Sequence, residues 1–161
     1  AVMNPHVIDR LVLVAPTGLK PKRGEILDIF YEPAERLLRL TVHDPTTVPE
    51  WAELYGAPPT PAQLEIATRN REMTARLTWK PYMFNPRLPH FLPRVPVPSL
   101  IVWGREDQIV PVECGEQYVR LLPDARLHVL DKCGHLPPLE QPDAFADLVT
   151  DFLTAGAARS R

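Results

Sequence analysis

Three short apolar runs stand out in the pattern of hydrophobic and polar positions along the chain. They are RLVLVAP at residues 10–16, SLIVWG at 99–104 and RLHVL at 126–130, and each is rich in valine, leucine or isoleucine. The first run has no alternation of polar and apolar positions, which is typical of a strand buried on both faces of a parallel sheet. We predict that all three runs are β-strands.

Segments with helical periodicity alternate with the last two of these strands. Residues 112–122 have one apolar side. Residues 142–153 place apolar side chains at i, i+3, i+4, i+7 and i+8, namely Phe145, Leu148, Val149, Phe152 and Leu153. This order of strand, helix, strand and helix predicts right-handed βαβ connections. The predicted fold class is α/β, with helices flanking a parallel sheet.

The middle of the chain has helical periodicity instead. Apolar positions between residues 24 and 45 follow helical spacing, and Pro33 divides them into two predicted helices. A longer helix is predicted after Thr60, a favourable N-cap residue. Its apolar stripe consists of Leu64, Ala67, Met73 and Leu77.

These patterns divide the chain into three parts. Residues 1–18 form a strand region, residues 19–92 a helical insertion, and residues 93–161 a C-terminal α/β part. The first residues, AVMN, resemble the tail of a helix that ends in a turn at Asn4-Pro5.

Composition narrows the functional classes. The content of 45% hydrophobic and 24% charged residues is that of a soluble globular protein, and the net charge of -2 favours neither nucleic acid nor an anionic membrane as a partner. No apolar run approaches the length of a membrane span. Five histidines and two cysteines show no metal-ligand spacing and no disulfide framework. We expect a cytoplasmic protein without a metal.

Two loops after neighbouring strands carry candidate chemistry. Glu106 and Asp107 follow residues 99–104, and His135 follows residues 126–130. Functional groups of open parallel sheets collect beyond the carboxyl ends of the strands. A carboxylate that accepts a hydrogen bond from one imidazole nitrogen leaves the other free to take a proton. Taken singly, such an aspartate is more often a turn former and such a histidine a structural residue, but the combination is more specific.

Two sequence motifs in these loops resemble a known enzyme family. The first is W-G-x-x-D-x-x-x-P, which runs from Trp103 through Asp107 to Pro111. The second is G-H-x-P-x-x-E-x-P, which runs from Gly134 to Pro142, and its glycine is expected to allow a sharp turn.

Together the motifs resemble the C-terminal half of an α/β-hydrolase-fold enzyme, and residues 19–92 resemble its cap domain. The resemblance implies that Asp107 is the acid and His135 the base of a catalytic triad that needs no cofactor. It covers nearly the whole chain, firmly over residues 99–153 and loosely in the cap.

The third group of the triad is not evident. In this family the nucleophile precedes the acid and sits on a strand-to-helix turn, commonly G-x-S-x-G, and no such motif occurs here. The two serines are Ser99, at the start of a strand, and Ser160, in the tail. Neither Cys114 nor Cys133 lies on such a turn, and we interpret both as structural.

We therefore expect a C-terminal fragment whose partner is the absent N-terminal half of the same fold, which carries the nucleophile. The strand at residues 10–16 would then have an open edge. The isolated chain is expected to be inactive and prone to aggregate.

The cap is expected to select the substrate, a medium-sized and largely apolar small molecule. The candidate substrate-binding residues are Trp79, Tyr82, Phe84, Ile109 and Leu136. Packing within the cap core is the alternative role for its aromatic residues. The sequence leaves the oligomeric state open.

The identity of the nucleophile determines which reaction an enzyme of this family catalyses. A serine would make an esterase, a lipase-like enzyme or a carbon–carbon bond hydrolase. An aspartate would make an epoxide hydrolase or a haloalkane dehalogenase, with Tyr31, Tyr55 or Tyr82 as a candidate epoxide-activating phenol. A non-catalytic scaffold or binding protein is the hypothesis from another class.

Overall fold

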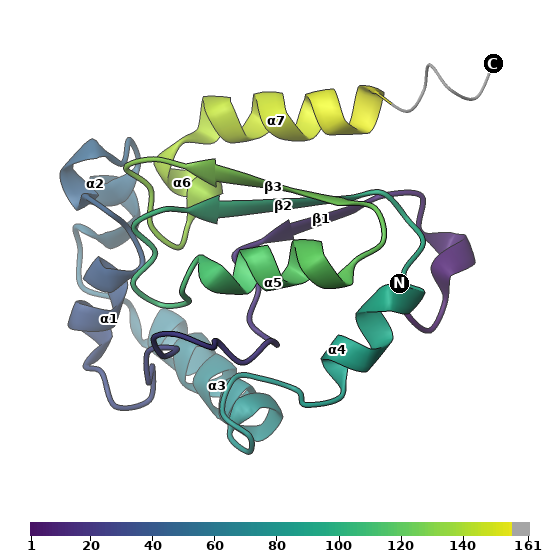
Figure 1. Ribbon diagram of the computed structural model, residues 1–161. Coiled ribbons are helices and arrows are strands. Elements are labelled where there is room, and N and C mark those ends of the chain that lie inside the picture. Colours follow the sequence, from purple (N-terminus) through teal and green to yellow (C-terminus); the bar gives the residue numbers. More distant parts are fainter. Residues whose placement is uncertain (156–161) are drawn as a thin grey trace.

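The three predicted strands form one parallel sheet. The computed structural model describes residues 1–155. It contains β1 (Leu11–Val14), β2 (Ser99–Gly104) and β3 (Ala125–Leu130) in the order β1-β2-β3 (Figure 1). The register of the second pair runs from Ser99 opposite Ala125 to Gly104 opposite Leu130. The predicted parallel sheet is confirmed.

Helices lie on both faces of this sheet. Helix α5 (Glu113–Leu121) lies on one face and α7 (Pro142–Thr154) on the other (Figure 1). The short α6 (Pro137–Glu140) precedes α7. The two helices predicted from residues 112–122 and 142–153 are therefore confirmed.

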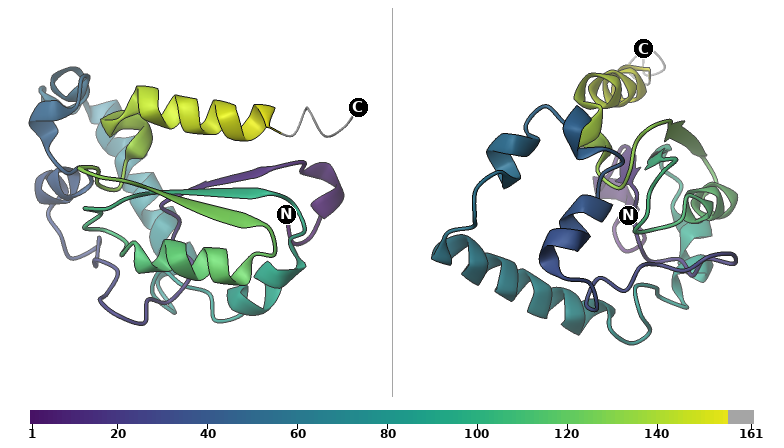
Figure 2. Two further views of the ribbon diagram at one scale, coloured as in Figure 1. Left: turned by 45° about the horizontal axis from the view of Figure 1, so that its top comes forward. Right: turned by 90° about the vertical axis from the view of Figure 1, so that its left-hand side faces the viewer.

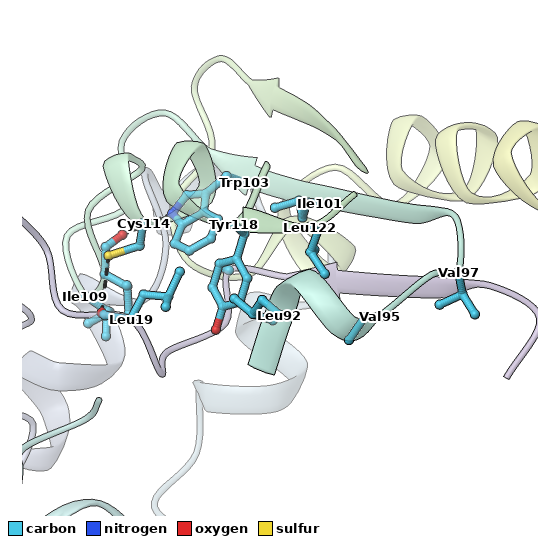
Figure 3. Packing of buried hydrophobic residues seen from close by; sticks show 12 residues of the cluster. Leu19, Leu92, Val95, Val97, Ile101, Trp103, Ile109, Cys114, Tyr118 and Leu122 are labelled. Carbon is cyan, nitrogen blue, oxygen red and sulfur yellow. Dashed lines mark hydrogen bonds between the residues drawn. The ribbon is translucent and has the colours of Figure 1, made fainter. Parts of the chain in front are cut away.

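Strand β2 is the centre of the core, because all its residues are buried. Its side chains alternate between the faces of the sheet. Ile101 and Trp103 belong to the hydrophobic cluster on the α5 side, and Leu100 and Val102 to the cluster on the α7 side. Figure 3 shows Trp103 next to Tyr118 of α5. A strand that is buried on both faces needs no polar alternation in its sequence.

Strand β1 lies at an edge of the sheet. It pairs with β2 on one side, and among the described residues no strand pairs with its other side. Its four residues are only partly buried. The complete burial predicted for residues 10–16 is therefore not reached within the described part of the chain.

The segment between β1 and β2 contains four helices and no strand. It contains α1 (Ala34–Leu40), α2 (Trp51–Tyr55), α3 (Pro61–Thr78) and α4 (Leu88–Phe91), with 3-10 turns at Pro45–Thr47 and Leu92–Arg94. Figures 1 and 2 show α1 and α2 beyond the carboxyl ends of the strands, and α3 on the side away from α7. The expected domain limits at residues 18 and 92 stay a prediction.

Helix α3 begins where the sequence predicts. Thr60 and Gln63 form a capping box, in which each side chain accepts a hydrogen bond from the other residue's backbone N–H. No residue of α3 is buried. Leu64, Met73 and Leu77 of the apolar stripe are 52%, 53% and 77% exposed, so within the described residues the stripe does not reach the core.

The prediction of a helix before Pro33 is wrong. Residues 24–32 contain bends, a turn and irregular backbone, and no helix. The Tyr82 hydroxyl accepts a hydrogen bond from Ile29 N at 2.9 Å and donates one to Leu27 O at 2.6 Å, and Leu27 N donates to Ile109 O. These contacts with distant residues take the backbone groups that a helix would pair internally. The helix predicted after Pro33 is confirmed as α1.

The first residues also differ from the prediction. Residues 1–4 are not helical, and a 3-10 turn at Pro5–Val7 follows them. Helices α2, α4 and α6, all of five residues or fewer, were not predicted. Among residues 1–155, no helix is long and apolar enough to cross a membrane.

Gly104, the last residue of β2, gives a test of the packing beneath the two loops. A Cβ atom added there would lie 2.0 Å from Gly134 O and 2.2 Å from Cys133 O, both backbone atoms. We predict that Gly104→Ala lowers the free energy of unfolding by about 3 kcal/mol or more, at the upper end of overpacking costs. Urea unfolding measures the change.

Gly24→Ala is the control, because a Cβ atom at Gly24 has 3.6 Å to its nearest neighbour and meets only the strain of a positive φ of 73°. That strain costs about 1–2 kcal/mol. A smaller loss for Gly104→Ala than for Gly24→Ala would contradict the predicted close packing.

Candidate active site

An acid and an imidazole meet where β2 and β3 end. The side chain of Asp107, in the loop after β2, is fully buried, and that of His135, after β3, is 24% exposed. The distance between Asp107 Oδ2 and His135 Nδ1 is 2.8 Å. The structure thus brings together the two residues predicted to be the catalytic acid and base.

Backbone groups fix the orientation of the Asp107 carboxylate. Its second oxygen, Oδ1, accepts hydrogen bonds from Ile109 N at 2.8 Å and Val110 N at 3.0 Å. The ring nitrogen of the buried Trp103 donates to Val110 O at 3.0 Å and holds the end of this loop on the core. With Oδ1 occupied, Oδ2 is left to face the imidazole.

The imidazole has one engaged and one free nitrogen. With a proton on Nδ1, His135 donates to Asp107, and Nε2 is left as a hydrogen-bond acceptor. No described residue forms a hydrogen bond with Nε2, and the ring reaches the surface. The arrangement can therefore take a proton from a group placed next to Nε2.

Glu106, the other acidic candidate in this loop, has a different position. Its Oε2 accepts from Cys133 N at 3.0 Å, and its own N–H donates to Cys133 O at 2.9 Å. Glu106 thus joins the loop after β2 to the loop after β3, while Asp107 contacts the imidazole.

Glu140 is a site residue that sequence reasoning missed. It is buried, and its carboxylate accepts hydrogen bonds from the N–H groups of Gly134, Leu136 and His43. The sequence feature that could have identified Glu140 is its position in the G-H-x-P-x-x-E-x-P motif. Gly134 was expected to allow a sharp turn, but it has no positive φ. A Cβ atom there would lie 2.8 Å from His43 N, so the glycine is needed for close approach of the cap backbone.

Comparisons with known proteins identify the family of this chain. The model of the alpha/beta hydrolase family matches residues 1–148. The chain belongs to the alpha/beta hydrolase family. A curated relative from a Pseudomonas species, 2-hydroxy-6-oxononadienedioate/2-hydroxy-6-oxononatrienedioate hydrolase, is 31% identical over 95% of this chain and 57% of its own length. A protein of the same name from Paraburkholderia phymatum is 33% identical over 95% of this chain and 56% of its own.

A solved relative gives the same result in three dimensions. A meta-cleavage product hydrolase from Pseudomonas fluorescens IP01 superposes with a TM-score of 0.74 at 29% identity, over 96% of this chain and 59% of the other. The chain thus spans little more than half the length of these alpha/beta hydrolases.

The one serine and the two cysteines within residues 1–155 of this alpha/beta hydrolase chain are all buried. Ser99 begins β2, at the opposite end of the strand from the Asp107 loop, and its buried hydroxyl donates to Val97 O. Ser160 lies outside the described residues. Burial raises the pKa of Cys133 to about 12, with Glu140 as a further cause, and that of Cys114 to about 11. Both thiols are fully buried.

The five candidate substrate-binding residues do not form one group around His135. Leu136 is its half-buried neighbour, whereas Ile109 is buried in the core. Tyr82 and Phe84 line a hollow of about 290 Å³ whose lining does not include Asp107 or His135. Trp79 is 58% exposed and contacts Phe30 edge-to-face.

No group of three or more histidine, cysteine, aspartate or glutamate side chains within residues 1–155 is arranged to hold a metal ion. His135 Nε2, which no described residue engages, is the atom of this site that can accept a proton.

The thiol pKa values give a test. At pH 8 we predict that both cysteines react with a thiol-specific disulfide reagent at least about 10²-fold more slowly than a free thiol, since only the thiolate attacks. The rate should rise about tenfold per pH unit up to pH 10 without a plateau, because both pKa values lie higher.

Absorbance of the released thiol measures the rate, and Cys114→Ser and Cys133→Ser variants assign it to each residue. Both should react at ordinary rates in urea. Rapid reaction of native Cys133 would contradict its structural role.

Proposed function

We propose that the protein is a hydrolase of carbon–carbon bonds in which Asp107 and His135 are the acid and the base of a catalytic triad. The observation that carries the proposal is the 2.8 Å contact between His135 Nδ1 and Asp107 Oδ2, with Nε2 free. The substrate class follows from the names of curated relatives, which are hydrolases of 2-hydroxy-6-oxo dienoic acids. The substrate would therefore be a small, conjugated oxo acid.

The proposal places the nucleophile, a serine, in a segment outside residues 1–161. Two observations support this: the chain spans only 57% of the Pseudomonas relative, and the thiols and the described serine are unsuited to attack. The partner of the site would then be the remaining part of the same fold, next to the open edge of β1.

His135 would act first as base and then as acid. Hydrolysis of a carbon–carbon bond adds hydroxyl to the acyl carbon and a proton to the departing carbon. His135 Nε2 takes the proton of the attacking serine hydroxyl, and the imidazolium returns it to the leaving carbon, which leaves an acyl-serine. His135 Nε2 then takes a proton from a water molecule, whose oxygen attacks the acyl carbon, and the imidazolium returns this proton to the serine oxygen, which frees the carboxylic acid. Asp107 holds Nδ1 protonated and stabilises the imidazolium, since its carboxylate lies 2.8 Å away.

The alternatives have less support. Of the three candidate phenols for an epoxide hydrolase, the Tyr82 hydroxyl is engaged with Leu27 and Ile29. Tyr31 is 86% exposed, and Tyr55 is 38% exposed with its ring against Trp51. An ester substrate would use the same acid and base, and only the relatives' names favour the carbon–carbon bond. A scaffold without activity has no need of a buried carboxylate facing an imidazole. Two reduced thiols fit the cytoplasmic location that we also propose.

Substitution of the acid and the base tests the triad in the protein at its full natural length. We predict that His135→Ala and Asp107→Asn each lower kcat for 2-hydroxy-6-oxononadienedioate by about 10⁴-fold, because the nucleophile is then not deprotonated or the imidazole has the wrong tautomer. Loss of the absorbance of the conjugated dienol measures the rate.

Asp131→Asn is the matched control, since Asp131 is an exposed loop aspartate that pairs with Arg105 and does not contact His135. Its kcat should stay within a factor of two. An enzyme that hydrolyses simple esters but not the dienoic acid would refute the substrate class, and full activity of Asp107→Asn would refute the triad.

A further inference from the structure

Glu140 joins two segments that are far apart in the sequence. Its Oε2 accepts from His43 N, in the cap, at 2.7 Å. The same carboxylate accepts from Gly134 N at 2.8 and 2.9 Å and from Leu136 N at 3.1 Å, on either side of His135. We propose that Glu140 is a positioning residue that fixes the catalytic imidazole by holding the histidine loop to cap residues 41–43.

Because the Glu140 carboxylate is buried, these N–H groups take the place of water as its hydrogen-bond donors. Glu140 is 9% exposed, and among the described residues no lysine, arginine or histidine side chain forms an ion pair with it. A buried carboxylate without a cation is stabilised by the N–H groups that point at it. The three donors must therefore converge, which fixes the backbone on both sides of His135.

The backbone of His135 itself continues this junction. His135 N donates to Thr41 O at 2.8 Å. Gly134 lies so close to the cap that an added Cβ atom would be 2.8 Å from both Val42 C and His43 N. The loop that carries His135 therefore cannot shift unless residues 41–43 shift with it. Conversely, a displacement of residues 41–43 would displace this loop.

The inference rests on the proposed function, because an imidazole needs accurate placement only if it transfers protons. Misplacement by about 1 Å costs on the order of 10²-fold in rate. Replacement of Glu140 should therefore lower kcat strongly and KM little, since Glu140 does not touch the substrate in this proposal.

Glu113 provides a matched control. It is also 9% exposed, and its carboxylate accepts from the backbone N–H groups of Lys22 and Arg23. It thus makes the same kind of loop contact in the same chain, away from His135. Glu113→Gln and Glu140→Gln each turn one oxygen that accepts hydrogen bonds into an amide donor.

The experiment compares both variants with the unchanged protein at full natural length by NMR and kinetics. Glu140→Gln should weaken or abolish the downfield signal of the His135 Nδ1 proton. It should also speed amide exchange of either His43 or Leu136, whichever faces the new NH₂ group, about tenfold, as expected for one lost hydrogen bond. It should lower kcat about 10²-fold with KM within a factor of three. Glu113→Gln should leave the His135 signal, the amide exchange rates, kcat and KM unchanged. The two variants should lower Tm to a similar extent.

The outcomes separate the alternatives. An intact His135 signal and unchanged kcat in Glu140→Gln, with only Tm lowered, would show a purely structural role and overturn the inference. If Glu140→Gln does not fold, Glu140→Asp, which withdraws the carboxylate by one methylene, is measured in the same way. If the unchanged protein has no hydrolase activity, the proposed function fails, and the NMR comparison still decides whether Glu140 positions the imidazole.

Discussion

The parallel pairing of β2 with β3 is the constraint on which the acid–imidazole contact depends. Because Gly104 lies opposite Leu130, the two strands end at the same level and their loops start side by side. Hydrogen bonds from Arg105 N to Leu130 O and from Glu106 N to Cys133 O continue the pairing beyond the strands. The burial of β2 on both faces fixes this register, since a shift by one residue would exchange the side chains of the two faces.

The elements that the sequence predicted well are those in which the local pattern and the tertiary environment agree. The strands and helices α5 and α7 have apolar positions that face the two hydrophobic clusters on either side of the sheet, so apolar runs and helical periodicity locate them. The helix expected before Pro33 failed because Tyr82 and Ile109, which are distant in sequence, take the hydrogen bonds of Leu27 and Ile29. No local pattern contains that information.

The same limit applies to the site. The contact between Asp107 and His135 was predictable, because strand order brings both loops to one edge of the sheet. The separate roles of Glu106 and Asp107 were not, since they depend on which carboxylate meets which N–H group. Glu140 and Gly134 gain their importance from cap residues 41–43, more than 90 positions earlier in the chain. A contact of that separation is visible only once the chain has folded.

The placement of the cap between two hydrogen-bonded strands has an evolutionary consequence. Strands β1 and β2 remain neighbours whatever the length of chain that connects them, so insertions and deletions in the cap need not disturb the acid or the imidazole. Changes of sequence or length in α2 and α3 would therefore leave the contact between Asp107 and His135 in place. The exception is the short stretch around Val42 and His43, where the backbone packs against Gly134 and where drift in sequence or length would reach the loop that carries His135.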